Sequence, residues 1–470
     1  DAAVVFDTAG PEMLVRNSLW IDNGEIRACL QVRLPGEGRK IQAELAAEIL
    51  TMVMPDLVAA GLYYTQGDEP AMQRHYRVLA ERREILAQLD GRGLCAFVPD
   101  GAVLPRASGL SEMPLEGAVP FAAPAELAVT LNACGREIRG MGIPKGITVI
   151  TGGAFHGKST LLQALVRAVY PHVPGDGREG IVVDDTALRV GVEDGRSVRG
   201  TDLSMFVRDL PGGISTKDFS TLSASGSTSE AANLLEAMEA GARTFLIDED
   251  SSAVNFLIRD VRVRKLLGDE REPLIPLTDR IRSLASAGMN FILVAGACGD
   301  YLDLADNIIV MTNYRAECAK MSSWSRVAIG STSELAEVPQ SRPFAAYMQP
   351  LQKHVRPASA VERQVKVKLA GDSLLQIGFL VADTSRLVTL VDRQQRLGAG
   401  FMLLNMLQNA ASNTAEGSAP ASDSVAGVAQ KLCDVVCNVG FRNLPQGMSR
   451  EMSLPRAVDI ACVAFRLNGK

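Results

Sequence analysis

Residues 152–159 read GGAFHGKS, and this stretch decides the fold. Gly152, four residues and then Gly157-Lys158-Ser159 match the pattern GxxxxGK[ST]. The strand-like run ITVIT (147–151) precedes the pattern and the helix-like run LLQAL (161–165) follows it, which is the strand–loop–helix context of a phosphate-binding loop. The predicted nucleotide-binding residues of this loop are Gly152, Gly153, Ala154, Phe155, His156, Gly157, Lys158, Ser159 and Thr160.

The chemistry of such a loop assigns roles to two side chains. Glycines let backbone N–H groups turn inward around a phosphate, and the positive end of the following helix points at it. Lys158 is predicted to bridge the β- and γ-phosphates as a catalytic residue, and Ser159 to ligate Mg²⁺. No NKxD motif, which reads guanine, occurs in the chain, so we expect ATP and Mg²⁺ as nucleotide and cofactor.

A second element of the site follows an apolar run in TFLIDED (244–250). Asp248 is predicted to hold Mg²⁺ through water, and Glu249 to polarise the attacking water as general base. Asp250 is the alternative base. Three consecutive carboxylates also occur in solvated loops, but their pairing with a phosphate loop favours the catalytic interpretation.

The stretch LSASGSTSE (222–230) lies shortly before the acidic strand. Ser227 and Glu230 have the spacing of a capping box, in which Ser227 caps a helix and Glu230 reaches back. This is the layout of an ABC signature motif, whose helix end is offered to a γ-phosphate held by another subunit. We therefore predict nucleotide contacts from Ser225, Gly226 and Ser227; the alternative is an ordinary capped surface helix.

At 470 residues the chain is too long for a single core. Alternating strands and helices predict an α/β fold, with a P-loop ABC-type ATPase core at 116–345. An α+β N-terminal domain (1–115) and a mixed, basic C-terminal domain (346–470) flank it. Core strands are expected at 146–151, 181–184, 244–248, 291–295 and 307–311, and helices at 41–61, 70–90, 386–408 and 426–438.

Charge and hydropathy limit the partners. No uninterrupted run of about 18 apolar residues occurs, so no membrane domain is expected. A net charge of −6 argues against a polyanion binder over the whole surface, but residues 351–470 carry 14 Lys/Arg against 9 Asp/Glu. Three basic clusters either contact nucleic-acid phosphates or are solvated faces: Arg74, Arg77, Arg82 and Arg83; Arg259, Arg262, Arg264 and Lys265; and Arg363, Lys366 and Lys368.

Several longer strings resemble one family. GGAFHGKSTLL, PHVPGDGRE, VEDGRSV, DFSTLSASGSTSEAANLLEAMEAGA, LIDEDSSAVNFLIRD and GDYLDLAD are similar to the predicted ABC-class ATPases of bacteria and some protists, over about residues 95–315. The similarity is greatest to a kinetoplastid mitochondrial member that belongs to an RNA-editing, RNA-binding complex. This resemblance implies a homodimer, RNA as cargo or substrate, other RNA-editing proteins as partners and a mitochondrial matrix location, with a cytoplasmic location as the alternative.

The chain departs from transporter-type ABC domains in three ways. It has no glutamine between Gln163 and Gln340, no histidine between His172 and His354, and no aromatic residue between Phe121 and Phe155. The Q-loop glutamine, the switch histidine and the usual adenine-stacking aromatic are therefore absent, leaving Phe121 or aliphatic packing for adenine. Arg178 and Arg196 follow the loop in Asp-Gly-Arg turns and either form turns or reach phosphate.

These departures predict slow or conditional hydrolysis and tell against a transporter. The favoured interpretation is a homodimeric ATPase that couples nucleotide-dependent closure to RNA binding or remodelling. A monomeric P-loop kinase acting on a small molecule is the first alternative. A nucleotide-gated scaffold with negligible turnover is the second.

Overall fold

A six-stranded sheet carries the phosphate loop. The computed structural model describes the chain except for residues 1–3, 7–8, 23, 39, 66, 209, 211, 269–271, 297, 320–338, 356–363, 411–422, 446–450 and 470. The strand order is β12 (Leu188–Val190), β15 (Thr244–Asp248), β16 (Asn290–Val294), β10 (Ile147–Gly152), β17 (Asn307–Thr312) and β18 (Arg315–Cys318). The first five strands are parallel, and β18 returns antiparallel to β17. Four of the predicted core strands are thereby confirmed.

Successive side chains of a strand point to opposite faces of the sheet. Apolar side chains lie on both faces here, and helices cover both. Ile150, Leu246 and Ile292 join the core that contains α4 (Lys158–Arg167), the helix after the loop. Phe245 and Ile247 point into the opposite core, which contains α5 (Gly226–Glu239). Shorter helices follow: η4 (Glu249–Ser251), α6 (Val254–Leu257), α7 (Val261–Leu267), η6 (Leu277–Asp279), α8 (Ile281–Ser286) and α9 (Asp300–Leu304).

The strand predicted at 181–184 belongs to a different sheet, so its assignment to the parallel sheet is wrong. β11 (Val182–Val183) pairs antiparallel with β7 (Leu94–Pro99), in the order β11-β7-β9-β8. The Asp184 N–H donates to the Cys95 carbonyl at 2.9 Å, and β12 takes the edge of the central sheet instead. β8 (Ala128–Ala133), η3 (Ala125–Leu127) and β9 (Arg136–Pro144) complete this region. A short hairpin pairs β13 (Val198–Thr201) with β14 (Phe219–Thr221).

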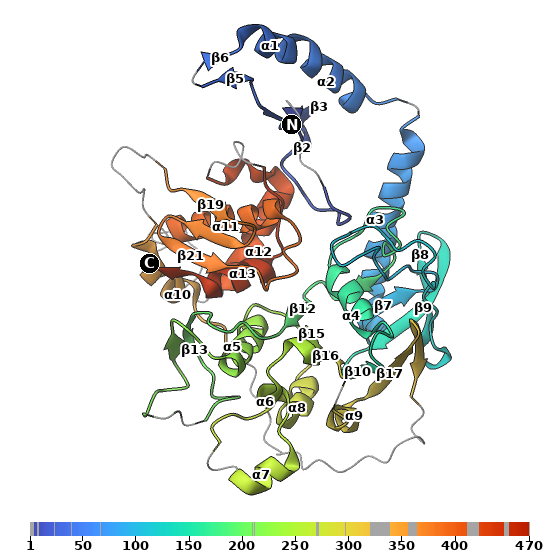
Figure 1. Ribbon diagram of the computed structural model, residues 1–470, viewed down its shortest axis with the longest axis vertical. Helices are drawn as coiled ribbons and strands as arrows, with labels where there is room; N and C mark the ends of the chain where they lie inside the picture. Colours follow the sequence, from blue (N-terminus) through green and yellow to red (C-terminus); the bar gives the residue numbers. More distant parts are fainter. Residues whose placement is uncertain are drawn as a thin grey trace.

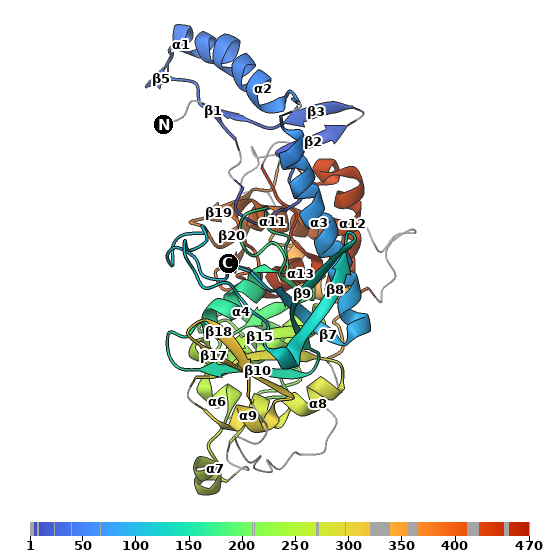
Figure 2. The ribbon, with the colours of Figure 1, turned by 90° about the vertical axis from the view of Figure 1, so that its right-hand side faces the viewer.

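The N-terminal region projects from the rest of the chain (Figures 1 and 2). Its paired strands are β1 (Val4–Val5) with β4 (Gln31–Val32), β2 (Leu19–Asp22) with β3 (Glu25–Ala28), and β5 (Gly36–Glu37) with β6 (Lys40–Ile41). A continuous helix follows as α1 (Ala43–Glu48), the π-helical η1 (Ile49–Val53) and α2 (Met54–Leu62). Then α3 (Glu69–Leu89) and η2 (Asp90–Arg92) lead into β7. Both helices predicted here, at 41–61 and 70–90, are confirmed.

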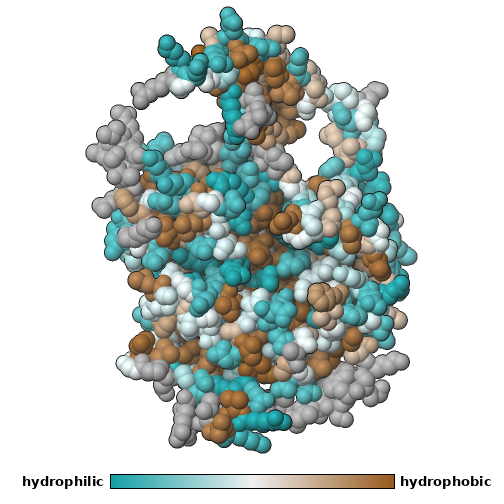
Figure 3. All heavy atoms as spheres, in the orientation of Figure 1, coloured by the Kyte–Doolittle hydropathy of each residue, from teal (hydrophilic) through white to brown (hydrophobic). Residues whose placement is uncertain are grey.

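The helix Ala43–Leu62 is long and apolar enough to cross a membrane, by length and composition alone; within the described part of the chain no other helix passes this test. Core helices and signal sequences pass the same test, so the finding is weak evidence. The sequence criterion misses the helix because Glu44, Glu48 and Asp56 interrupt its apolar run. Its apolar side chains are largely exposed, and Figure 3 shows brown atoms gathered at this end of the molecule.

The C-terminal region packs against α5. α10 (Phe344–Gln352) precedes the antiparallel sheet β19 (Val367–Ala370), β20 (Leu374–Ile377), β21 (Leu380–Asp383) and β22 (Asn468–Gly469). α11 (Arg393–Asn409), α12 (Val425–Val439), η9 (Phe441–Asn443) and α13 (Ala457–Arg466) complete it. One apolar core runs from α5 into these helices. The helix expected from 386 begins at Arg393, because the Asp392 side chain accepts a hydrogen bond from the Gln395 N–H at 2.6 Å and caps it. The domain boundaries at 115 and 345 stay predictions.

Candidate nucleotide site

The phosphate loop joins β10 to α4 and needs glycine at two places. Gly152 has φ +135° and Gly157 has φ +95°, a region that side chains disfavour. A Cβ on Gly152 would also collide with the backbone of Met311. Phe155 is the exception, with φ +63° and 95% of its surface exposed. A bulky residue in this conformation is strained, and such strain gathers at functional sites.

The lysine of the loop folds back over its carbonyl groups. Lys158 Nζ donates to the carbonyl oxygens of Gly152 at 2.8 Å and Gly153 at 2.9 Å. Gly153, Ala154 and Ser159 are exposed, and Thr160 is half-buried in the first turn of α4. The cradle therefore opens to solvent, with the ammonium group held at its rim.

His156 fastens the loop to the turn between β17 and β18. Its Nδ1 accepts from the Asn313 N–H at 2.8 Å, and its carbonyl accepts from the Tyr314 N–H at 3.0 Å. The Tyr314 ring lies against Gly157, where an added Cβ would come within 2.7 Å of Cδ1. Sequence spacing gives no signal for this contact, since Tyr314 follows the loop by more than 150 residues.

The first carboxylate of the acidic strand reaches the loop across the sheet. Val294 of β16 pairs with both Asp248 and Ile150, which places the ends of β15, β16 and β10 on one line. Burial raises the pKa of Asp248, while the nearby cations Arg189 and Lys158 offset part of the rise. The Asp248 carboxylate and the exposed Ser159 hydroxyl supply the hard oxygen donors that Mg²⁺ prefers, so the residues present fit this ion.

Glu249 faces the end of the neighbouring strand. Its Oε2 accepts a hydrogen bond from the Gly296 N–H at 2.6 Å, directly after β16. Asp250, by contrast, is exposed. The choice of Glu249 over Asp250 as the base stays a prediction. Gly296 follows β16, in the region where a switch histidine would be expected. In this chain a backbone N–H makes the polar contact there.

The predicted capping box is wrong. α5 begins at Gly226 with Ser225 as the preceding cap residue, and the Ser225 hydroxyl bonds the Thr228 hydroxyl at 2.9 Å. Glu230 is buried and its Oε2 accepts from the Ala253 N–H at 2.6 Å instead. A contact with the loop after the acidic strand thus replaces the local one. Ser225 is exposed, so the helix N-terminus still reaches the surface.

Within one chain, α5 and the phosphate loop do not converge. α5 is bound to the segment after β12: the Ser229 hydroxyl accepts from the Glu193 N–H at 3.0 Å, and Asn233 Nδ2 donates to the Gly191 carbonyl at 2.9 Å. β15 and β16 separate β12 from β10, which at the usual strand spacing is about 14 Å. Figure 1 shows α5 on the β12 side of the sheet.

The two arginines after the loop hydrogen-bond to other parts of the chain. Arg178 is buried and its Nε donates to the Leu104 carbonyl at 3.0 Å. Arg196 bonds the side chains of Asn233 and Glu236. Both side chains therefore join segments that are distant in the sequence, and their predicted contact with phosphate stays a prediction.

The basic clusters divide into paired and exposed residues. Arg82 caps the C-terminal end of α4 through the Ala168 and Val169 carbonyls, at 3.2 and 2.9 Å. Arg259 pairs with Glu272 and Arg264 with Asp279. The exposed members are Arg74, Arg77, Arg83, Arg262, Lys265, Lys366 and Lys368. Arg363 lies outside the described residues.

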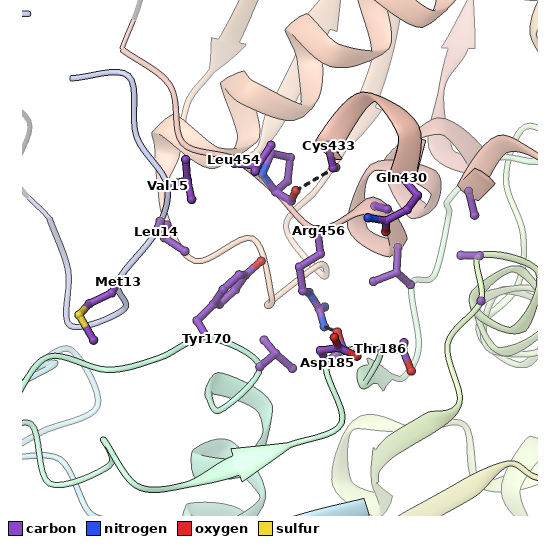
Figure 4. Close-up of a pocket in the computed structure, with 17 residues that line it drawn as sticks. Met13, Leu14, Val15, Tyr170, Asp185, Thr186, Gln430, Cys433, Leu454 and Arg456 are labelled. Carbon is purple, nitrogen blue, oxygen red and sulfur yellow. Dashed lines mark hydrogen bonds between the residues drawn. The ribbon is translucent and has the colours of Figure 1, made fainter. Parts of the chain in front are cut away.

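A cavity of about 510 Å³ lies between the N-terminal segment Met13–Val15, the end of α4 and the C-terminal helices (Figure 4). Arg456 and Tyr170 line it, but both direct hydrogen bonds to the buried Asp459, at 2.8 and 3.1 Å. This network joins the segment directly after α4 to α13. The sequence gives no indication of it.

Comparison with known proteins identifies the family. Residues 68–347 match the family model of an ABC ATPase P-loop domain, and residues 1–65 match that of the N-terminal region of ATPases of the ABC class. The chain belongs to the ABC-class ATPase family. Family membership implies nucleotide binding and, as a rule, Mg²⁺, and it confirms the predicted α/β P-loop fold.

Individual relatives of the ABC-class ATPase match over parts of the chain. An uncharacterized protein of Methanocaldococcus jannaschii is 32% identical over 204 residues, which is 42% of this chain and 44% of that protein. The match thus spans less than half of the relative's length. Among solved structures, cbiO1 from Clostridium perfringens, part of the ABC transporter complex cbiONQ, is 15% identical, with a TM-score of 0.25 over 40% of this chain and 84% of its own. The ADP conformation of an ATP-binding cassette of an ABC transporter is 11% identical, with a TM-score of 0.29 over 47% and 89%.

Proposed function

We propose that this ABC-class ATPase hydrolyses ATP at composite sites between two copies of the chain and couples their closure to RNA binding. The separation between α5 and the phosphate loop carries the proposal. The N-termini of α4 and α5 both have exposed residues and are both suited to bind phosphate. In one chain, however, three strand spacings separate the strands next to them, β10 and β12. In a two-fold dimer, the Ser225–Ser227 end of one copy meets the loop of the other.

Four side chains perform the reaction in this proposal. Lys158 leaves the Gly152 and Gly153 carbonyls to contact the β- and γ-phosphates, and Asp248 with Ser159 would hold Mg²⁺, which neutralises phosphate charge. Water then attacks the γ-phosphorus and the bond to the β–γ bridging oxygen breaks, which yields ADP and phosphate. Glu249 takes the water proton once it leaves the Gly296 N–H. That preformed hydrogen bond supports slow or conditional turnover.

RNA binding is the finer part of the proposal. Its support is the resemblance of the motif strings to a kinetoplastid mitochondrial member of an RNA-editing complex, together with the exposed basic residues. Lys368 is exposed on β19, an edge strand, Lys366 is exposed directly before it, and Arg74 and Arg77 are exposed on α3. On the same resemblance we assign the protein to mitochondrial RNA editing, in the matrix, with other editing proteins as partners. A cytoplasmic location is the alternative.

The test of RNA binding is affinity for a single-stranded RNA as a function of salt, with and without ATP. Phosphate contacts predict a linear fall of log affinity with log salt, and the double variant Lys366→Ala/Lys368→Ala should reduce that slope by about 1.4. Lys431→Ala is the matched control, because this lysine is also exposed but lies on α12, outside the proposed RNA surface. An affinity that is independent of salt, or a slope that the double variant leaves unchanged, contradicts the proposed RNA surface.

A further inference from the structure

The direction of the triphosphate follows from the strand order. Asp248 ends β15, Glu249 follows it and Gly296 follows β16, so the groups that serve the γ-phosphate all lie on one side of β10. β17 is the neighbour of β10 on the other side, with Met311 in register with Gly152. A triphosphate whose γ end points toward β15 therefore directs its nucleoside toward the turn after β17.

An aromatic side chain stands at that turn. The Tyr314 ring lies against Gly157, and 39% of the surface of this residue is exposed. Asn313 and Tyr314 both adopt left-handed backbone, with φ +51° and +63°; asparagine is often found there, but the bulky tyrosine is disfavoured. Their N–H groups bond Nδ1 and the carbonyl of His156, so the turn is fixed to the phosphate loop.

The other aromatic residues near the loop in sequence suit this role less well. Phe121 is only 2% exposed and packs in the core, so it is inaccessible to a base. Phe155 lies in the middle of the loop and is almost fully exposed, so little of its ring is packed against the protein. A stacking surface needs an exposed face on a fixed ring, and Tyr314 combines both.

We propose that Tyr314 is the surface on which the nucleobase of the bound nucleotide stacks. The proposal rests on the proposed function, since it takes the phosphate loop as the nucleotide site. It supplies the aromatic contact that the sequence lacks ahead of the loop. Stacking tolerates any base, so Tyr314 holds the base without selecting adenine over guanine.

Calorimetric titration of the full chain with Mg·ATP and with inorganic tripolyphosphate tests the proposal. Tyr314→Ala should weaken ATP binding between about 5-fold and 150-fold, the range found for loss of a stacked base, and should leave tripolyphosphate binding unchanged. Tyr314→Phe should bind ATP like the wild type, and Tyr314→Leu, which keeps bulk without an aromatic face, should lose affinity. Tyr64→Ala, at an exposed aromatic residue after α2 and outside the site, is the matched control and should bind ATP normally.

The outcomes separate this proposal from the proposed function. If Lys158→Ala abolishes ATP binding while Tyr314→Ala retains it, the stacking role is wrong and the loop remains the nucleotide site. An equal loss of ATP and tripolyphosphate affinity in Tyr314→Ala also overturns it, because the ring would then act by supporting the loop. If the wild type binds neither ligand, the proposed function itself fails.

Discussion

Replacing Glu230 by glutamine should change how the stability of the protein depends on pH. Glu230 lies in the first turns of α5, is buried, and accepts a hydrogen bond from the Ala253 N–H at 2.6 Å. Burial raises the pKa of its carboxyl from 4.5 to about 7, although that hydrogen bond favours the ionised form. In the unfolded chain the carboxyl regains its ordinary pKa.

The sign and size of the effect follow from proton linkage. Between pH 4.5 and about 7 the folded state holds a proton that the unfolded state has released, so stability falls as the pH rises through this window. Each unit of difference in pKa corresponds to about 1.4 kcal/mol, so the loss amounts to about 3 kcal/mol by pH 7. Below pH 4.5 both states are protonated and Glu230 contributes no slope.

Urea unfolding of the wild type and of Glu230→Gln measures this loss. The amide oxygen can still accept from Ala253 and does not titrate, so the free-energy difference between the two proteins should shift by about 3 kcal/mol between about pH 4.5 and pH 7.5, in favour of the variant at the higher pH. Glu137→Gln, at an exposed position, should show no such shift. A difference between wild type and Glu230→Gln that is the same at both pH values would refute this account of Glu230.

Two further substitutions test the site and its support. Glu249→Gln should slow ATP hydrolysis by about 10²- to 10⁴-fold while leaving ATP affinity within a few-fold, measured by single-turnover hydrolysis and by calorimetry; unchanged turnover would exclude Glu249 as the base. Asp459→Ala removes the buried partner of Arg456, Thr389 and Tyr170 and should cost about 3–5 kcal/mol in urea unfolding, because the Arg456 charge is left buried. Asp372→Ala removes a fully exposed carboxylate and is the control. If Asp459→Ala lowers the free energy of unfolding no more than Asp372→Ala does, the network contributes little.

The sequence predicts the parts of the fold that local pattern controls. β15 and β16 are continuous apolar runs, as strands buried on both faces must be, and the loop motif identifies the strand and helix around it. The run at 181–184 is equally apolar, but pattern alone cannot say which sheet it joins. Its antiparallel pairing with β7 depends on a strand more than 80 residues earlier.

Long-range contacts account for what the sequence misses at the site. Ser227 and Glu230 have the spacing of a capping box, yet the Ala253 N–H competes successfully for the carboxylate. The positions of Arg178 and Arg196 in the sequence suggest contacts with phosphate. Their hydrogen bonds to Leu104 and Glu236 cannot be predicted from the sequence, because these partners are distant along the chain. Tyr314 is invisible to motif spacing because it reaches Gly157 only when β17 lies beside β10.

Mixing two inactive variants tests the composite site most directly. Lys158→Ala disables the loop, and Ser225→Arg, at an exposed position, blocks the N-terminus of α5. Each variant alone should hydrolyse no ATP. If the two variants pair at random in a two-fold dimer, half of the dimers contain one copy of each, and such a dimer has one intact site out of two. The mixture should therefore recover about a quarter of wild-type ATPase activity. No recovery in dimers shown to contain both variants, or full activity of Ser225→Arg alone, would contradict composite sites.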